Sequence, residues 1–301
     1  MSEVHTRDVC AVVVNWNGWR DTVGCVASLL ALEEPPGLVV VCENGSTDGS
    51  ATQLRDALVG SEGVHLLVLP QNLGYAGGLN AGVAWARRHT QARWFWLLNN
   101  DLCALPGALR ALLDAHRQVP DAGLVGSVLL EWDTPSPVQA VGGRYLKWLG
   151  VGVHAKEAPD ARDDVSLAMD YPVGASLLVS AAYLDRVGPM EDGYFLYYEE
   201  IDWVERGRRH GLRPVIALRS RLRHKEGAST GSQGGVRNKS LLSEHHGVVN
   251  RLRVTRKFWP QYLPIVWASL FAVAGDRVLH GEFSRAALVL RLMFSPRLWL
   301  R

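Results

Sequence analysis

Polar side chains in three separate parts of this 301-residue chain could do chemistry. Asn99, Asn100 and Asp101 follow an apolar run at 94–98, and a carboxylate at a strand end can bind Mg²⁺ or Mn²⁺. An Asn-Asn-Asp turn is also a common helix N-cap, so a structural role stays open. His224 lies among Arg and Lys residues, which favours a neutral ring and suits a metal ligand, although such a histidine is more often only solvated.

The third part places three carboxylates, Glu199, Glu200 and Asp202, within four residues. Like charges this close repel each other, so burial or a nearby cation must offset the cost. A carboxylate in such a setting could act as general base for a hydroxyl nucleophile. The alternative is a solvated acidic helix start, stabilised by the helix dipole. The aromatic segment 194–198 just before the cluster argues against full exposure.

Apolar strands alternate with helices in the pattern needed to position these groups. The pattern predicts an α/β fold with a mostly parallel sheet. Residues 121–170 are less regular and predict a mixed β region with a mobile loop near 158–164. The strands are expected at 9–14, 38–42, 64–69, 94–98, 173–180 and 215–218, and the helices at 21–32, 51–58, 79–89, 106–116, 181–187, 203–210 and 236–259.

Polar loops follow the first four strands, at 15–17, 43–48, 72–78 and 99–101. Open α/β sheets bind ligands at the carboxyl ends of their strands, so we expect these loops to converge on one crevice. The glycines within 74–78 would let the backbone approach an anion at a helix N-terminus. The first strand is not followed by a dinucleotide-binding glycine motif, and the chain has no Walker A pattern.

Charge is unevenly distributed along the chain. Residues 250–301 carry nine Lys or Arg and two acids, a net charge of +7, which leaves −5 for the rest. Basic charge interleaved with Trp259, Trp267 and Trp299 suits an anionic membrane surface, or else these aromatics fill a small core. The apolar run 262–275 is shorter than the roughly 20 residues of a spanning helix, so an interfacial helix is the stronger prediction.

Compartment can be inferred from the cysteines and the N-terminus. The four cysteines form no paired motif, and residues 1–8 lack the apolar stretch of a signal peptide. Both features favour a reduced, cytoplasmic setting.

Taken in order, six segments between about 9 and 231 resemble family 2 glycosyltransferases with the GT-A fold. The subgroup resembled most is the rhamnosyltransferase-like enzymes of bacterial polysaccharide assembly, supported by residues 224–231 and the basic helix after them. The resemblance implies a GT-A domain at 1–235, with a nucleotide-sugar half at 1–118 and an acceptor-side half at 119–235, followed by a basic, amphipathic helical region at 236–301. The segments are VVVNWNG (12–18), ENGSTDGS (43–50), NLGYAGGLN (72–80), LLNND (97–101), GAS (174–176) and FLYYEEID (195–202).

The resemblance also implies roles for individual residues. Glu200 stands at the position of the catalytic base, with Glu199 and Asp202 shaping the site. Asp101, Asn99 and His224 would bind a divalent metal, Mn²⁺ or Mg²⁺. The expected donor-binding residues are Asn15, Trp16, Asn17, Glu43, Asn44, Asn72, Gly77, Asn80, Asn99 and Asn100.

Three of these positions depart from the family pattern, which has Asp where this chain has Asn99, Glu43 and Glu200. The first change removes charge from the metal site. The second lengthens the side chain at the nucleobase pocket, and the third changes the reach of the base.

The implied reaction is an inverting transfer of a sugar from a nucleoside-diphosphate donor, with L-rhamnose from dTDP-rhamnose as the best candidate. A glycan or lipid-linked hydroxyl would be the acceptor. The composition of residues 250–301, and not the resemblance, makes peripheral contact with the inner face of the cell membrane one of the two interpretations of this region. Homodimerisation is left open, and nothing indicates nucleic-acid binding.

Two other classes of function remain. A sugar nucleotidyltransferase is disfavoured because its usual glycine-rich, basic loop is absent at 15–18. A non-catalytic nucleotide-sugar binding or assembly module is favoured by Asn99 but opposed by the carboxylates at 199–202.

Overall fold

A computed structural model of the chain describes residues 4–133, 137–161, 164–225 and 240–300. Within these ranges, ten strands form one sheet in the order β10-β12-β6-β11-β4-β1-β2-β3, with β5 paired to β12 and β7 to β6. The strands of this sheet are β1 (Val9–Asn15), β2 (Leu38–Asn44), β3 (Val64–Leu69), β4 (Trp94–Asn99), β5 (Leu102–Ala104), β6 (Ala122–Glu131), β7 (Val138–Ala140), β10 (Val165–Ser166), β11 (Ser176–Ser180) and β12 (Arg213–His224).

The first four strands are parallel, as the alternation of strands and helices predicted. β1 is buried along its whole length, which explains why its sequence is a continuous run of small and β-branched apolar residues. In the register of the sheet, Asn15 lies beside Glu43 and Val14 lies beside Asn99. The polar residues at these strand ends therefore stand next to one another.

The second half of the sheet is mixed. β11 is antiparallel to both β4 and β6, whereas β12 is parallel to β6. The short strand β5 follows Asp101 directly and pairs antiparallel with the end of β12, so that Leu102 lies opposite His224. This pairing brings together Asp101 and His224, two of the three predicted metal ligands.

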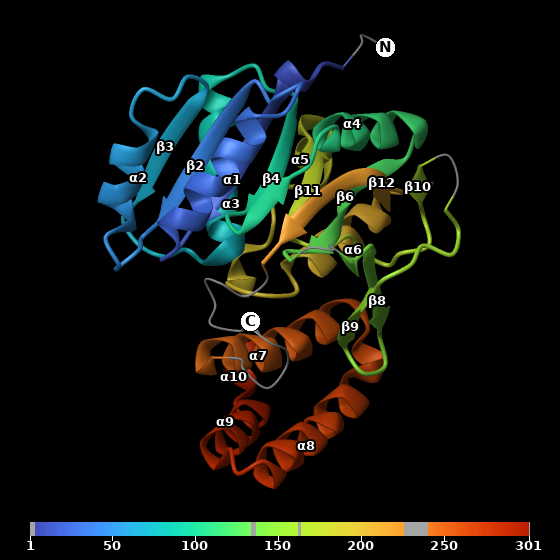
Figure 1. Cartoon of the computed structure of the whole chain (residues 1–301). Coiled ribbons are helices and arrows are strands. Elements are labelled where there is room, and N and C mark those ends of the chain that lie inside the picture. The colour runs from blue at the N-terminus through green and yellow to red at the C-terminus, as the bar shows by residue number, and fades with distance from the viewer. Residues whose placement is uncertain (1–3, 134–136, 162–163, 226–239, 301) are drawn as a thin grey trace.

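Helices cover both faces of the sheet (Figure 1). One face packs on α1 (Trp19–Leu30), α2 (Ser50–Leu58) and α4 (Ala108–Gln118). The other packs on α3 (Gly74–His89), α5 (Ala181–Val187) and α6 (Glu199–Arg209). This is the predicted α/β architecture with helices on both sides.

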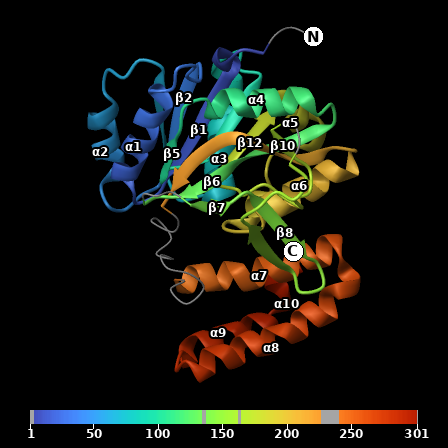
Figure 2. The ribbon, with the colours of Figure 1, turned by 45° about the vertical axis from the view of Figure 1, so that its right-hand side comes forward.

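The helices of the C-terminal region form a separate layer (Figures 1 and 2). α7 (Leu241–Phe258) lies against the rest of the chain, and α8 (Leu263–Leu279) and α9 (Phe283–Met293) lie on its far side, with α10 (Pro296–Trp299) beside α7. A hairpin of β8 (Gly142–Leu146) and β9 (Val151–Ala155) also reaches this layer, and short 3-10 turns occur at Thr6–Asp8, Asp192–Tyr194 and Pro260–Tyr262.

Two of the three tryptophans that suggested a membrane surface are buried. Trp259 is 8% exposed and Trp299 is 9% exposed, and each belongs to an apolar core. The core interpretation is therefore correct for these two. In the described part of the chain, one helical stretch, Pro260–Leu279, is long and apolar enough to cross a membrane, and most of it is not buried.

Several elements differ in length from the sequence-based prediction. β12 is 12 residues long rather than four, and α6 begins at Glu199, so the acidic cluster is its first turn. The glycine-rich segment is the start of α3 rather than a loop. A Cβ at Gly78 would lie 2.6 Å from Val14 Cγ2, so glycine is what allows α3 to pack this closely on β1.

Candidate active site

The polar loops after β1 and β2 are joined by hydrogen bonds. Asn15 Nδ2 donates to Ser46 Oγ at 3.2 Å, and the backbone N–H of Thr47 donates to Asn17 Oδ1 at 2.8 Å. The buried Glu43 carboxylate accepts the Ser46 backbone N–H at 2.8 Å. The predicted convergence of these loops is therefore found.

The loops after β3 and β4 join the same group. Asn44 Nδ2 donates to the Gly74 carbonyl at 2.9 Å and to Asn72 Oδ1 at 3.1 Å. Asn100 Nδ2 donates to the Gly18 carbonyl at 3.1 Å and to Thr22 Oγ1 at 3.0 Å. These amides hold the loops in place, and their contact with a donor stays a prediction.

The remaining predicted donor residues differ in their surroundings. Asn80 binds the backbone of Met190 with both its amide nitrogen (2.9 Å) and its amide oxygen (3.2 Å), which ties α3 to the segment before α6. Gly77 packs against Leu73, where a Cβ would meet the leucine Cβ at 2.7 Å. Trp16 is half-buried beside the loop after β1.

The predicted metal ligands Asp101 and His224 face each other. His224 Nε2 lies 3.4 Å from Asp101 Oδ1, and both side chains are buried. The Lys225 backbone N–H also donates to the Asp101 carbonyl at 3.1 Å. Asn99 ends β4 next to this pair, with its backbone N–H on the Ala175 carbonyl at 3.0 Å.

Gln139 orients the His224 ring. The Gln139 amide nitrogen faces Glu131 Oε2 and the His224 carbonyl, so its oxygen faces His224 Nδ1 at 2.8 Å and accepts that proton. In the neutral ring, Nε2 then directs a lone pair toward the Asp101 carboxylate. Two electron-rich atoms at this separation fit a cation bound by both.

The pair alone is a small ligand set. Among the described residues, no cluster of three or more His, Cys, Asp or Glu side chains is arranged to hold a metal ion. Mg²⁺ and Mn²⁺ commonly bind through one or two carboxylates together with substrate phosphates. Asp101 and His224 fit that kind of site.

Glu199 and Glu200 open α6 in a setting that disfavours their charge. Burial raises the pKa of the Glu200 carboxyl to about 7. Burial, and then the adjacent charge of Glu200, raise the pKa of the Glu199 carboxyl well above its usual value. Within the described chain, Oε2 of each has no hydrogen-bond partner, so each leaves an acceptor position free for a ligand.

Tyr75 connects the carboxylates to the metal pair. Its hydroxyl donates to the Gly174 carbonyl at 2.8 Å, and a Cβ on Gly174 would lie 3.8 Å from Glu200 Cβ. Burial raises the pKa of the Tyr75 hydroxyl, and the charges of Glu199, Glu200 and Asp101 raise it further. The charges of both halves of the site therefore act on one buried phenol.

Asp202 points elsewhere, although it shares the first turn of α6. It is fully buried, accepts the Tyr194 hydroxyl at 3.0 Å and Arg206 Nε at 2.7 Å, and pairs with Lys257. Its charge is therefore compensated by α6 and α7, and these contacts make it an anchor between the two helices. Any further role in shaping the site stays a prediction.

The backbone leading to Glu199 has an uncommon conformation. Phe195, Tyr197 and Tyr198 have φ values of 56°, 68° and 73°, which cost non-glycine residues on the order of 1–3 kcal/mol each. Asn250 of α7 holds this turn, because its Nδ2 donates to the carbonyls of Tyr194 and Leu196 at 2.6 and 2.8 Å. Asn250 therefore connects the C-terminal region to the carboxylates.

Sequence reasoning missed Tyr75, Gln139 and Asn250. Tyr75 lies inside the segment 72–80, but only the glycines of that segment were given a role. Gln139 and Asn250 belong to no motif, and no signal in a single sequence marks them. Residues 226–231, part of the segment that supported the rhamnosyltransferase-like resemblance, lie outside the described residues.

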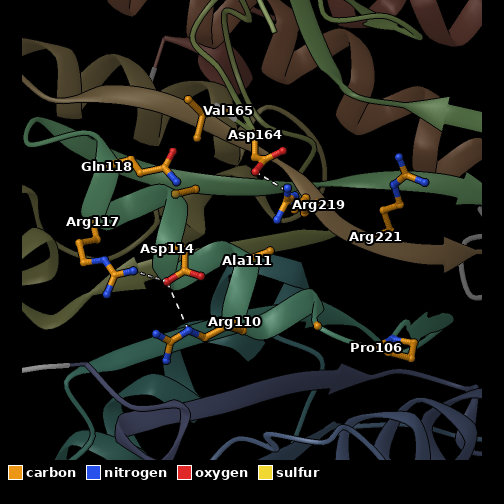
Figure 3. Close-up of a pocket in the computed structure, with 12 residues that line it drawn as sticks. Pro106, Arg110, Ala111, Asp114, Arg117, Gln118, Asp164, Val165, Arg219 and Arg221 are labelled. Atoms are coloured by element: carbon orange, nitrogen blue, oxygen red, sulfur yellow. Dashed lines mark hydrogen bonds and ion pairs between the residues drawn. The ribbon is translucent and has the colours of Figure 1, made fainter. Parts of the chain in front are cut away.

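A cavity of about 580 Å³ lies away from this site, between α4 and the β10–β12 edge of the sheet (Figure 3). Its arginines are largely paired: Asp114 contacts Arg110 and Arg117, and Asp164 contacts Arg219 at 2.8 Å. None of the predicted site residues lines it.

Comparison with known proteins agrees with the arrangement of the sheet and site. Residues 10–135 match the family model described as glycosyl transferase family 2. An N-acetylglucosaminyl-diphospho-decaprenol L-rhamnosyltransferase of Mycobacterium tuberculosis is 28% identical over 241 residues, covering 73% of this chain and 76% of that protein. A low-salt glycan biosynthesis hexosyltransferase of Haloferax volcanii, Agl10, is 22% identical over 68% of this chain and 63% of that protein.

Solved structures share the fold. A crystal structure of GalNAc-T7 with UDP, GalNAc and Mn²⁺ aligns with a TM-score of 0.67 at 12% identity, over 94% of this chain but only 54% of that one. The mannosyltransferase PcManGT of Pyrobaculum calidifontis, in complex with GDP-Man and Mn²⁺, aligns with a TM-score of 0.57 at 15% identity, over 98% and 88% of the two chains. These matches identify the chain as a glycosyltransferase that carries a family 2 domain on the GT-A fold.

Proposed function

We propose that this glycosyltransferase inverts the configuration at the anomeric carbon of a nucleoside-diphosphate sugar as it transfers the sugar to the hydroxyl of a glycan or lipid-linked acceptor. The proposal is supported by two groups of side chains, the Glu199–Glu200 pair and the Asp101–His224 pair, whose facing atoms lie 3.4 Å apart, because the charges of Glu199, Glu200 and Asp101 all act on the Tyr75 hydroxyl. The Glu199–Glu200 pair suits a general base, and the Asp101–His224 pair suits binding of a metal that holds the leaving diphosphate. L-rhamnose from dTDP-rhamnose is the proposed donor, supported by the name of the mycobacterial relative.

Glu200 is the proposed base. Its unpartnered Oε2 takes the proton of the acceptor hydroxyl as the acceptor oxygen bonds to the anomeric carbon. The bond from that carbon to the diphosphate oxygen breaks, and its electron pair leaves with the diphosphate. A single displacement inverts the configuration at the anomeric carbon and needs only one base. Glu200 and Glu199 have different surroundings, which agrees with one of them acting as that base.

Asp101 and His224, with Asn99 beside them, are the proposed metal-binding residues. A bound Mn²⁺ or Mg²⁺ would neutralise the charge that develops on the leaving diphosphate. Gln139 keeps the Nε2 lone pair of His224 directed into the site. The two GT-A neighbours described above contained Mn²⁺, which supports a divalent metal here.

The proposed cellular setting is the cytoplasmic side of a membrane, where a lipid-linked acceptor is accessible. The four cysteines within the described residues are free thiols, as a reducing compartment favours. The proposed boundary between the GT-A domain and the helical region, at residue 235, lies outside the described residues, between the end of β12 and the start of α7. Homodimer formation stays untested.

The first experiment is a donor screen. Purified protein is incubated with dTDP-rhamnose, other dTDP-sugars, UDP-sugars or GDP-sugars, in Mn²⁺, Mg²⁺ or EDTA, while nucleoside-diphosphate release and thermal stability are followed. We expect one donor class to be stabilising and hydrolysed, and EDTA to abolish the release. A folded protein that binds a donor but never releases diphosphate, with or without acceptor lipid, would instead identify a binding module.

A further inference from the structure

The outer side of α8 is apolar over three helical turns. Between residues 264 and 275, every position of this helix that faces solvent is occupied by an apolar residue or glycine. These positions recur at helical spacing along one face, where a soluble helix normally carries polar side chains. They are Pro264, Ile265, Ala268, Phe271, Ala272 and Gly275.

Helix α9 extends the same surface. Phe294 is 64% exposed and Phe271 is 46% exposed. Their ring centroids lie 6.5 Å apart, and each lies 5.4 Å from the Trp267 ring between them. At the turn between the helices, Leu279 is 85% exposed and Phe283 is 67% exposed. We call this surface, formed by Ile265, Phe271, Leu279, Phe283, Leu290 and Phe294, the outer apolar face.

Apart from the contacts of Phe271 and Phe294 with Trp267, the outer apolar face lies outside the core that holds the helices together. A separate set of residues, including Val266 and Leu270 of α8 and Val289 and Leu292 of α9, packs with α7 in a buried core. Exposed apolar area is unfavourable relative to buried area, and large contiguous apolar patches on a folded protein mark interaction sites, so the side chains on the remaining face indicate a partner.

Charge indicates what kind of partner this is. From residue 283 to the C-terminus the sequence has four arginines and no acid. Arg291 on α9 and Arg297 on α10 are exposed, whereas Arg277 and Arg285 contact Glu244. Two acids, Asp276 and Glu282, lie at the turn between the helices, and both contact Arg277, at 3.6 and 3.4 Å. Phenylalanine and leucine mixed with exposed arginine suit the interface of an anionic bilayer.

We propose that the outer apolar face of α8 and α9 lies in the headgroup region of an anionic lipid bilayer. The helices rest on the bilayer and do not cross it. α8 packs its inner side on α7 and α9, and its Arg277 is 4% exposed and bound to Glu244, so it cannot be surrounded by lipid. α7 and the buried Trp259 and Trp299 do not contact the bilayer.

This placement also orients the catalytic site, and here it rests on the proposed function. The site lies at the end of the sheet that approaches α7, and α8 and α9 lie on the opposite side of α7 (Figures 1 and 2). A bilayer on the outer apolar face would therefore be at the same end of the molecule as Glu200. A lipid-linked acceptor could then reach the base without leaving its membrane.

The test is flotation of the full chain with vesicles of phosphatidylcholine alone or mixed with phosphatidylglycerol. We expect binding to the mixed vesicles, weakened by salt. The double substitution Phe271→Ser with Phe294→Ser, and separately Leu279→Ser with Phe283→Ser, should each lower the vesicle partition coefficient about tenfold or more. Val59→Ser, at an equally exposed position after α2, is the matched control and should bind like the wild type.

Three results would overturn the proposal: no flotation of the wild type, unchanged flotation of both double variants, or a dimer in lipid-free ultracentrifugation that dissociates in the double variants. Circular dichroism confirms that each variant is folded. Donor hydrolysis without vesicles, compared among the same proteins, keeps the two proposals separate. Flotation without hydrolysis contradicts the reaction alone, and hydrolysis without flotation contradicts the membrane contact alone.

Discussion

Glu200 must be ionised to accept a proton, and burial raises the pKa of its carboxyl to about 7. Protons are held more tightly here than by a free glutamate, so lowering the pH through this value removes the base. We therefore expect kcat/KM for sugar transfer to rise with pH along an acid limb near 7 and then level off. Initial rates in buffers of constant ionic strength measure this limb.

Substitution of Glu200 tests the same role directly. Glu200→Gln keeps the size of the side chain but cannot take a proton, so turnover should fall by roughly 10²–10⁴-fold while donor binding persists. Glu205→Gln, on the same helix but paired with Arg208, is the control and should stay active. Near-normal turnover of Glu200→Gln would assign the base to another residue.

Gln139 offers a test of the metal site that leaves all the proposed metal-binding residues in place. Gln139→Ala removes the acceptor of the His224 Nδ1 proton, and loss of such an orienting partner usually weakens metal affinity about 10–100-fold. The half-saturating Mn²⁺ concentration for activity should rise accordingly. Gln118→Ala, in the cavity beside α4, should leave it unchanged. Equal half-saturating Mn²⁺ concentrations in the wild type, Gln139→Ala and Gln118→Ala would contradict a role of His224 in metal binding.

At the scale of elements, the turn before α6 depends on a neighbouring helix. Asn250→Ala leaves the carbonyls of this turn without their donor, at a cost of roughly 1–3 kcal/mol in folding free energy. Because the turn carries Glu199 and Glu200, we expect kcat to fall, donor KM to change little and the acid limb to shift.

The control for Asn250→Ala is Thr255→Val, which removes a buried hydrogen bond from the same helix, to the Arg251 carbonyl, without touching the turn. It should lower thermal stability and leave the pH profile alone. If the two variants had the same pH profile, Asn250 would serve stability only.

The sequence predicted elements well where their signals are local. β3 and α5 have the predicted bounds, because an apolar run or a helical pattern ends there at turn residues. β6 falls in the mixed β region predicted at 121–170, but its bounds and the extension of β12 were missed, since two glycines within β6 and the arginines within β12 hide the apolar pattern. The site divides in the same way: carboxylates in motifs were identified, whereas Tyr75, Gln139 and Asn250 act through contacts distant in sequence.

At the scale of the whole molecule, the C-terminal helices have a core of their own and are joined by buried charges. Arg277 and Glu244, about 4–5% exposed, link α8 to α7, and Arg285 of α9 lies 3.7 Å from the same carboxylate. Breaking a buried pair typically costs about 3–5 kcal/mol. Glu244→Gln should therefore lower the free energy of local unfolding of α8 and α9 more than that of the sheet.

Hydrogen exchange measures this difference. Amides of α8 and α9 should lose protection in Glu244→Gln, while amides of β1 and β4 keep it. Asp276→Asn, at a carboxylate on the rim of the same group and 56% exposed, is the control with little expected change. Uniform loss of protection throughout the chain would mean that the two parts unfold as one unit.

The pairing of β5 with the end of β12 has a consequence for the order in which the protein matures. Asp101 is synthesised with the first half of the sheet, but His224 reaches it only after β12 has inserted beside β6. A ribosome-bound chain that ends before β12 can have a formed nucleotide half and still lack its second metal ligand. Tight Mn²⁺ binding would then appear late during synthesis, and it would report completion of the sheet.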